Sequence, residues 1–221
     1  MKTLTDFEPD TFFGSGYAFS GPTLETLDYR LLKLPGRRVP AGAVYQFDEW
    51  EYVKAEEFYD HFIDDPTDFM LRKYLPLVNG AFAPLAQMGP VREVFGYYLG
   101  TITSVIPFAL PPFQQMLETL QKAGAEALKW AGHLGKEGHQ IAAMGFPNAF
   151  GGSAAAPFDL IGDWFRGTTG VMVDMYERPE KLLAVMEKLV PISIKMGLDL
   201  ARDRGHPIIG FMLHKGADGF M

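Results

Sequence analysis

An uninterrupted apolar run near the C-terminus, Pro207 to Leu213 (PIIGFML), follows directly on a long helical pattern that opens at Pro179. Within that pattern apolar residues recur every three or four positions, which predicts a helix with one buried face, and Pro191 should kink it. A strand that is apolar at every position is typical of a parallel sheet covered on both faces. The two segments together therefore predict a helix leading into a buried parallel strand.

The same alternation of strand and helix extends upstream. Short apolar strands are expected over Pro9 to Gly16 and over Ile141 to Phe150, and the second meets the small-residue loop at Gly151. Helical spacing predicts a helix over Phe113 to Ala131, closed by the glycine-rich segment Gly132 to Gly138. This alternation favours an α/β class with a parallel sheet, either a barrel or an open doubly wound sheet. No Gly-x-Gly-x-x-Gly follows a strand, so the dinucleotide-binding version of the open sheet has no support.

Four further segments have recognisable patterns before the first long helix. Helices are expected over Thr23 to Leu32 and over Ala55 to Ile63, and aromatic residues favour an extended segment over Tyr45 to Val53. A helix capped by Asp65 is expected to run to Gln87, because proline at position 66 suits a first helical turn. After the second strand, a short helix is expected over Pro157 to Phe165.

Charge and cysteine content exclude several classes of function. The formal net charge is −7 and the pI is about 5.2, which argues against a basic face for nucleic acid or an anionic membrane. The chain has no cysteine, so it offers no disulfide, thiolate nucleophile or cysteine-ligated metal. Its longest apolar stretch, Val105 to Phe113, is broken by prolines, and no signal peptide is evident. A cytoplasmic protein is expected, with a small-molecule substrate and no membrane segment.

From Phe146 onward, the run FPNAFGGSAAAPFDLIGDWFRGTTGVMVDMYERPEKLL resembles the uroporphyrinogen decarboxylase superfamily, which also contains corrinoid-linked methyltransferases. The landmarks are APFDL at Ala156 to Leu160, the Arg166-Gly167 helix end and HKGADGFM at His214 to Met221. Upstream, YQFDEWEYVKAEEF and DDPTDFMLRKYLP are similar to the decarboxylase-like subgroup. The resemblance implies a partial TIM-type (β/α)₈ barrel with its first and last strands missing. Residues 1–221 would then form one incomplete barrel domain.

The resemblance also implies a class of reaction, a lyase or methyl-transfer enzyme acting on a tetrapyrrole or a corrinoid-linked methyl substrate. Three family positions differ here: Phe13-Gly14-Ser15 lacks the decarboxylase aspartate, Asp163 stands where the family has tyrosine, and Lys215 stands for a serine. This chain implies no cofactor of its own. For the intact methyltransferase type the family implies zinc and a corrinoid protein, and a homodimer is a further expectation. The alternative is a non-catalytic truncated domain with only a packing or interaction role.

Position within a barrel selects the candidate site, because barrel enzymes carry their chemistry at the carboxyl ends of strands. The candidate catalytic residue His214 follows the last apolar strand and is expected to act as acid, base or ligand, oriented by Asp218. Lys215 alternates with His214, so only one of the two is expected to point into the barrel mouth. Lys215 is a candidate substrate-binding residue. The remaining substrate-binding candidates are Gly151, Gly152 and Ser153.

Two acidic segments have competing interpretations. Asp159 and the candidate catalytic residue Asp163 lie four apart on one helix face, where they could hold a cation or share a proton. The simpler reading is that Asp159 caps the helix and Asp163 is solvated. Glu49 and Glu51 would share one strand face, usually a solvated one.

Two expectations about the assembled site follow. The strands Pro9 to Gly16, Met144 to Gly152 and Ile208 to His214 should be parallel neighbours, with the loops after Phe150 and Leu213 opening on one concave site. Gly151 and Gly152 have an alternative explanation in a tight turn that needs positive φ. No metal site is expected, because the five histidines lack ligand spacing.

Overall fold

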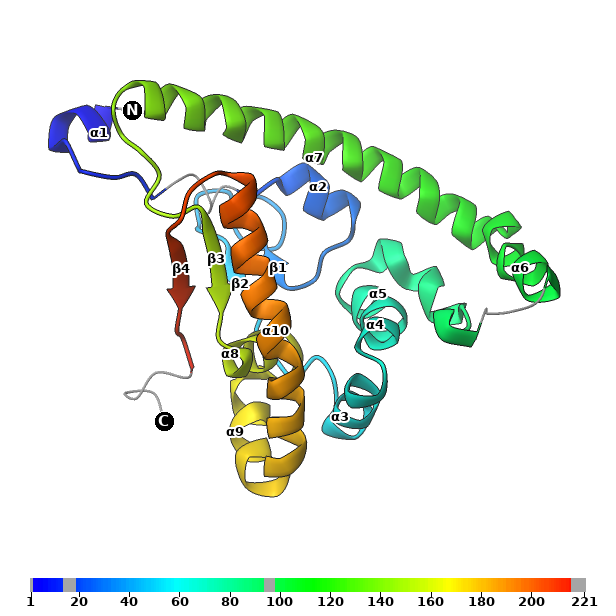
Figure 1. Cartoon of the computed structure of the whole chain (residues 1–221). Coiled ribbons are helices and arrows are strands. Elements are labelled where there is room, and N and C mark those ends of the chain that lie inside the picture. Colours follow the sequence, from blue (N-terminus) through cyan, green and yellow to red (C-terminus); the bar gives the residue numbers. More distant parts are fainter. Residues whose placement is uncertain (1, 14–18, 94–97, 216–221) are drawn as a thin grey trace.

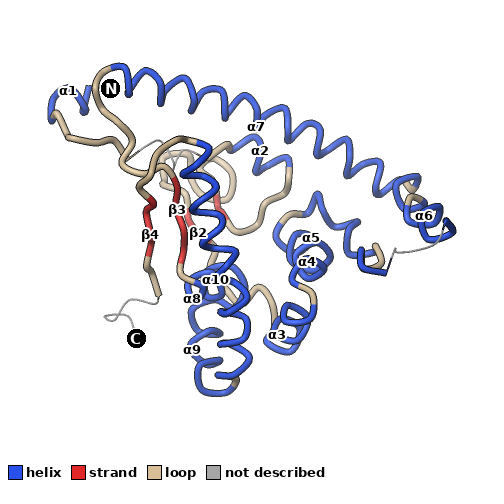
Figure 2. The backbone as a smooth tube through the Cα atoms, viewed as in Figure 1, coloured by secondary structure: helices blue, strands red, loops and turns tan. Residues whose placement is uncertain are grey.

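The computed structural model describes residues 2–13, 19–93 and 98–215, and these residues form a helix-rich mixed α/β structure with a few short strands (Figure 2). The helices are α1 (Lys2–Phe7), α2 (Gly21–Thr26), α3 (Ala55–Asp64), α4 (Pro66–Phe69), α5 (Leu75–Val78), α6 (Tyr98–Ser104), α7 (Pro111–Ala143), α8 (Pro157–Ile161), α9 (Gly167–Glu177) and α10 (Pro179–Asp203). The strands are β1 (Leu32–Lys33), β2 (Gln46–Phe47), β3 (Gly152–Ala155) and β4 (Ile209–Met212). Shorter 3₁₀ segments lie at Gly80–Gln87, Val91–Glu93 and Ile106–Ala109, and π-helical turns at Met70–Tyr74 and Gly162–Arg166.

The parallel pair β3–β4 organises the half of the molecule that holds the candidate site. The two strands pair from Gly152 with Ile209 to Ala155 with Met212, and α10 lies along them (Figure 1). Helices α8 and α9 lie beyond the carboxyl ends of the strands, while α7 crosses the opposite side of the molecule. The loops after β3 and β4 therefore both face α8.

A third extended segment, at Phe12, pairs in parallel with the residues just before β3. The Phe12 N–H donates to the Pro147 carbonyl at 2.8 Å, and the Ala149 N–H donates to the Phe12 carbonyl at 2.8 Å. The predicted parallel direction of the three segments is thus confirmed, although residues 14–16 of the first lie outside the described part. Strands β1 and β2 form a separate antiparallel pair. The described strands make two two-stranded sheets and do not close into a barrel.

The sequence placed the end of α7 too early. The helix runs through Gly132 to Gly138 and ends at Ala143, in the segment that was expected to form a strand. A helical glycine costs only about 1 kcal/mol relative to alanine, so neighbouring turns tolerate it. A glycine that ends a helix needs positive φ, and here that residue is Gly145, with φ +94°. The second strand consequently starts at Gly152, eleven residues after the start expected at Ile141.

Other element boundaries were also partly wrong. The helix expected over Thr23 to Leu32 is the shorter α2, which ends at Thr26. Of the extended segment expected over Tyr45 to Val53, only the two residues of β2 form a strand. Asp65 caps α4 as predicted, accepting the Asp68 N–H at 2.9 Å, but the long helix to Gln87 is broken. Pro76 cannot donate to the helix, and Asn79 is extended at φ −134° and ψ 111°. Helix α9 was not predicted, whereas α3 and α10 match their expected ranges closely, and α10 continues through Pro191.

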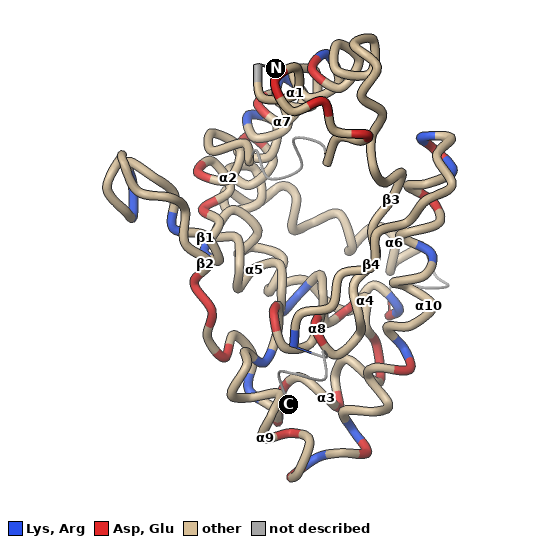
Figure 3. Tube along the Cα trace, turned by 90° about the vertical axis from the view of Figure 1, so that its left-hand side faces the viewer, with Lys and Arg blue, Asp and Glu red and all other residues tan. Residues whose placement is uncertain are grey.

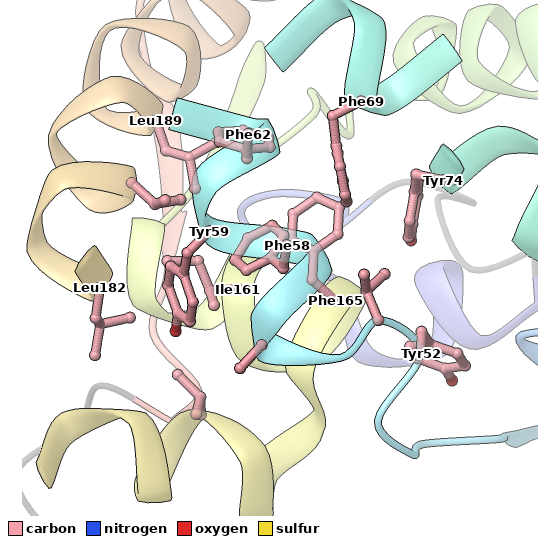
Figure 4. Close-up of a cluster of buried hydrophobic side chains, with 14 of the residues drawn as sticks. Tyr52, Phe58, Tyr59, Phe62, Phe69, Tyr74, Ile161, Phe165, Leu182 and Leu189 are labelled. Carbon is pink, nitrogen blue, oxygen red and sulfur yellow. The ribbon is translucent and has the colours of Figure 1, made fainter. Parts of the chain in front are cut away.

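An aromatic cluster holds α3 against the site-bearing half (Figure 4). The rings of Phe58 and Phe165 stack with centroids 5.0 Å apart and planes 25° apart. Phe62 and Phe69 pack edgewise or tilted on the same two rings. Fully burying a phenylalanine contributes about 1.5–3 kcal/mol, so this cluster fixes the π-helical turn that carries Phe165.

Candidate functional site

The loop after β4 is tied to α8 by one carboxylate. Asp159 accepts the backbone N–H of His214 at 2.7 Å and that of Lys215 at 2.6 Å. Helix α8 itself has no side-chain cap, so the predicted capping role of Asp159 is wrong. The buried Asp159 instead fixes the backbone at the carboxyl end of β4, and with it the directions of two candidate side chains.

The side chains of His214 and Lys215 both contact Asp163. His214 Nδ1 lies 3.3 Å from Asp163 Oδ1 and 3.4 Å from Oδ2, and the Lys215 ammonium forms an ion pair with Oδ1. Asp163 belongs to the π-helical turn Gly162–Arg166, and such turns frequently occur at functional sites. Asp159 and Asp163 do face the same loop, as their spacing predicted, but Asp159 binds its backbone N–H groups and the cation on Asp163 is the protein's own lysine.

The two consecutive residues after β4 point differently. The side chain of His214 is 65% exposed, whereas that of Lys215 is 1% exposed, although both reach Asp163. Gly162 makes room for the lysine, because a Cβ at position 162 would lie 2.8 Å from Lys215 Cδ. His214 therefore offers the accessible group of the site, and Lys215 supplies a buried charge beneath it.

Glu49 completes the charge arrangement and was missed by the sequence interpretation. Its Oε1 lies 3.4 Å from Lys215 Nζ and accepts the Thr168 N–H at 2.7 Å, and the Thr168 hydroxyl donates to it as well. Burial acts to raise the pKa of Glu49, but the Thr168 hydrogen bonds and the charge of Lys215 outweigh it and lower that pKa. Glu49 is thus held as a carboxylate at the first turn of α9, where the helix dipole favours negative charge.

The segment around Glu49 packs closely on the start of α9. Gly167 has φ +68°, and a Cβ there would lie 2.8 Å from the Trp50 carbonyl oxygen. Glu51 pairs with Arg166 beside that contact, and neither glutamate lies in a strand. A shallow pocket of about 290 Å³ opens between the two segments, lined by residues 49–51 and 166–170. The alternation of Glu49 and Glu51 was the available signal, but only the fold shows that each carboxylate pairs with a buried cationic side chain.

A buried ion network supports this side of the site. Arg166 Nε donates to Asp174 Oδ2 at 2.6 Å, Arg166 Nη1 donates to the Val53 carbonyl at 2.6 Å, and the Tyr59 hydroxyl donates to Asp174 at 2.7 Å. The guanidinium of Arg166 also pairs with Glu51. These contacts join α3, the segment before it and α9 into one support for the π-helical turn.

The predicted substrate-binding glycines lie elsewhere. Gly152 begins β3 and pairs with Ile209, five positions before His214, so Gly151 and Gly152 lie at the opposite end of the strands from His214. A Cβ on Gly151 would lie 2.3 Å from the His206 carbonyl oxygen, and one on Gly152 would lie 2.4 Å from that of Gly197. These glycines permit close backbone packing, and the prediction of one concave site shared with His214 is wrong. Ser153 is exposed and pairs with Gly210, and Asp218 lies outside the described residues.

Charges of both signs surround this end of the strands (Figure 3). Acidic and basic positions are intermixed around α8 and the end of β4. Over residues 2–13, 19–93 and 98–215, no group of three or more metal-ligating side chains comes together. Among those same residues, no helix has the length and apolar character needed to cross a bilayer.

Comparison with known proteins adds no relative. No protein-family model, curated protein or solved structure matches this chain. Chemically, the arrangement combines an exposed imidazole with a carboxylate on Nδ1, which is a competent acid–base pair.

Proposed function

We propose that this chain is an acid–base enzyme whose reacting group is His214, oriented by Asp163. One observation carries the proposal. His214 lies at the carboxyl end of a parallel strand, and its Nδ1 is 3.3 Å from Asp163 while Asp159 accepts its backbone N–H. A carboxylate accepts but does not donate, so Nδ1 carries hydrogen in this contact and Nε2 is the nitrogen that exchanges protons with substrate.

The resemblance to the uroporphyrinogen decarboxylase superfamily supplies the proposed fold and substrate class. On that resemblance the parallel β3–β4 pair would belong to a (β/α)₈ barrel and the substrate would be a tetrapyrrole. Loss of CO₂ from an acetate side chain leaves an electron pair that must take up a proton, and the imidazolium of His214 is placed to deliver one. The described residues do not fit the zinc of the methyltransferase branch, since they bring no three ligating groups together. We take the lyase reaction as the branch to test, because it needs the proton donor that His214 offers.

Turnover of His214→Ala tests the proposal. With uroporphyrinogen as the substrate and released CO₂ as the readout, the rate is expected to fall by about 10²-fold or more, as for removal of a general acid. His133→Ala, at an exposed position of α7, is the matched control and should retain the wild-type rate. Equal rates for His214→Ala and the wild type, or no CO₂ release by the wild type, would contradict the lyase proposal.

A second candidate is a non-catalytic interaction role, favoured by exposed apolar side chains. Phe211 and Leu213 on and after β4, and Ile194 and Met196 on α10, are all more than half exposed. Among the described residues β4 pairs only with β3, so its other edge has no partner strand. Such a surface is typical of a binding interface, and the state of association in solution tests it.

A further inference from the structure

Lys215 is shared between two carboxylates that come from distant parts of the chain. Its ammonium pairs with Asp163 Oδ1 and lies 3.4 Å from Glu49 Oε1, while its side chain is almost fully buried. A buried charge is strongly unfavourable unless it is paired, so the position of Nζ depends on both carboxylates. Moving either carboxylate would shift the lysine towards the other.

Glu49 is the fixed end of this arrangement. The N–H and hydroxyl of Thr168 hold its Oε1 at the first turn of α9. The close contact between Gly167 and the Trp50 carbonyl keeps the Glu49 segment against that helix. Glu49 therefore cannot follow Lys215, so the ammonium that contacts Asp163 also has a fixed second carboxylate beside it.

Asp163 is the group for which the lysine and the histidine compete. The same Oδ1 atom pairs with Lys215 Nζ and lies 3.3 Å from His214 Nδ1. We infer that Glu49 is a positioning residue for the His214–Asp163 pair: it holds Lys215 between two carboxylates and leaves Asp163 able to accept from His214. The effect on catalysis rests on the proposed function, whereas the effect on His214 itself does not.

The inference has a spectroscopic signature. The hydrogen bond at one ring nitrogen of a histidine determines which nitrogen carries the hydrogen. Neutral His214 should therefore be mainly the Nδ1–H tautomer, which ¹⁵N chemical shifts of the ring distinguish from the Nε2–H tautomer. In Glu49→Gln the lysine keeps Asp163 as its only charged partner, so its full charge acts on Asp163 and weakens that carboxylate as an acceptor for His214. The ratio of Nδ1–H to Nε2–H should then fall by about fivefold or more, the lower range of coupling between sites.

The experiment uses the full chain labelled with ¹⁵N-histidine, at a pH of about 8 or above where histidine is neutral. The spectrum of His214→Ala assigns the His214 signals, and Asp163→Asn gives the ratio without the orienting carboxylate. Glu56→Gln is the matched control, since it removes another glutamate from an ion pair, that with Arg178 at 3.0 Å, and should leave the ratio unchanged. Thr168→Val removes one anchor of Glu49 and should lower the ratio in the same direction, which keeps the test decisive if Glu49→Gln does not fold.

The two outcomes can be told apart. A wild-type tautomer ratio in both Glu49→Gln and Thr168→Val would overturn the positioning role of Glu49 and leave the proposed enzyme activity standing. Unaltered turnover in His214→Ala would overturn the proposed function while a lowered ratio in Glu49→Gln still supported the charge arrangement.

Discussion

At the scale of single residues, the chain surrounds its buried charges with several partners each. Asp174 is fully buried and faces Arg166, Tyr59 and Arg178, at 2.6, 2.7 and 3.3 Å respectively. Breaking a buried ion pair by removing one partner typically costs about 3–5 kcal/mol, because the other charge is left uncompensated. The same logic applies to Asp68, on the α4 side of the aromatic cluster, where the side chains of Arg72 and His61 meet one carboxylate.

Asp68 should make stability depend on pH in the acid range. The Arg72 hydrogen bonds are the main cause that lowers its pKa to about 2; burial opposes them and His61 adds to them. A carboxyl group with a lowered folded-state pKa stabilises above its unfolded pKa of about 4, and this contribution is lost as pH falls through about 2. The shift from 3.8 to about 2 corresponds to about 2.5 kcal/mol, so Asp68→Asn should lower the free energy of unfolding by about that amount at pH 7.

Urea unfolding at pH 7, 5 and 3 measures this dependence. The difference between wild type and Asp68→Asn should be largest at pH 7 and shrink by pH 3. Asp64→Asn, which removes an exposed carboxylate from its pair with Arg92, should change stability little at any of these pH values. A pH-independent difference for Asp68→Asn would show that lost packing, and not the charge of Asp68, causes the effect.

At the scale of elements, glycine has opposite roles in two helices. Gly132 lies within α7, where a Cβ would meet nothing within 4 Å. Gly167 lies at the start of α9 with φ +68° and ψ 168°, a region that residues with a Cβ rarely adopt. Sequence pattern alone does not separate the two glycines. They differ in backbone conformation and in the Trp50 carbonyl that lies against Gly167.

The same substitution should therefore have opposite effects at these two positions. Gly167→Ala should destabilise the protein by about 1–3 kcal/mol, because it adds backbone strain and a clash with the Trp50 carbonyl. Gly132→Ala should stabilise it by about 0.4–1 kcal/mol by reducing the freedom of the unfolded chain. Thermal unfolding of both variants measures the two effects, and destabilisation by Gly132→Ala would contradict the exposed helical position assigned to it.

At the scale of the whole molecule, the described surface is more apolar over β4 and α10 than an isolated domain needs. The buried stripe of α10 has exposed apolar neighbours on both sides in its second half, including Ile192 and Ile194. A helix of this kind is typical of one that packs between other elements. The open edge of β4 adds an unpaired row of backbone groups to the same region.

Association should follow from this surface under the interaction hypothesis. Phe211→Lys places a charge on the open strand and is expected to lower the apparent mass in sedimentation at a fixed protein concentration, while the melting temperature stays close to that of the wild type. Val91→Lys, at another exposed apolar position away from β4, is the matched control. A wild-type chain that sediments as a monomer and melts cooperatively would contradict the interaction role.

The sequence by itself determined α10, the start of α4 and the parallel direction of β3 and β4. Continuous apolar periodicity marked α10, the Asp65-Pro66 pair marked a helix start, and the apolar run ending at Leu213 marked β4. It also identified His214 and Asp163 as candidate catalytic residues. These features are local, because spacing and capping act within a few residues of the chain.

Only the tertiary structure decided which glycines end an element and which charged side chains pair. Whether Gly132 or Gly145 ends α7 depends on the sign of φ, and whether Gly151 lies at the start or the end of β3 depends on that boundary. Glu49 reaches Lys215 because the segment before α3 folds onto α9, a contact between residues far apart in the chain. Local patterns carry no information about such pairings, since the free energy that selects them comes from burial and charge compensation in the assembled molecule.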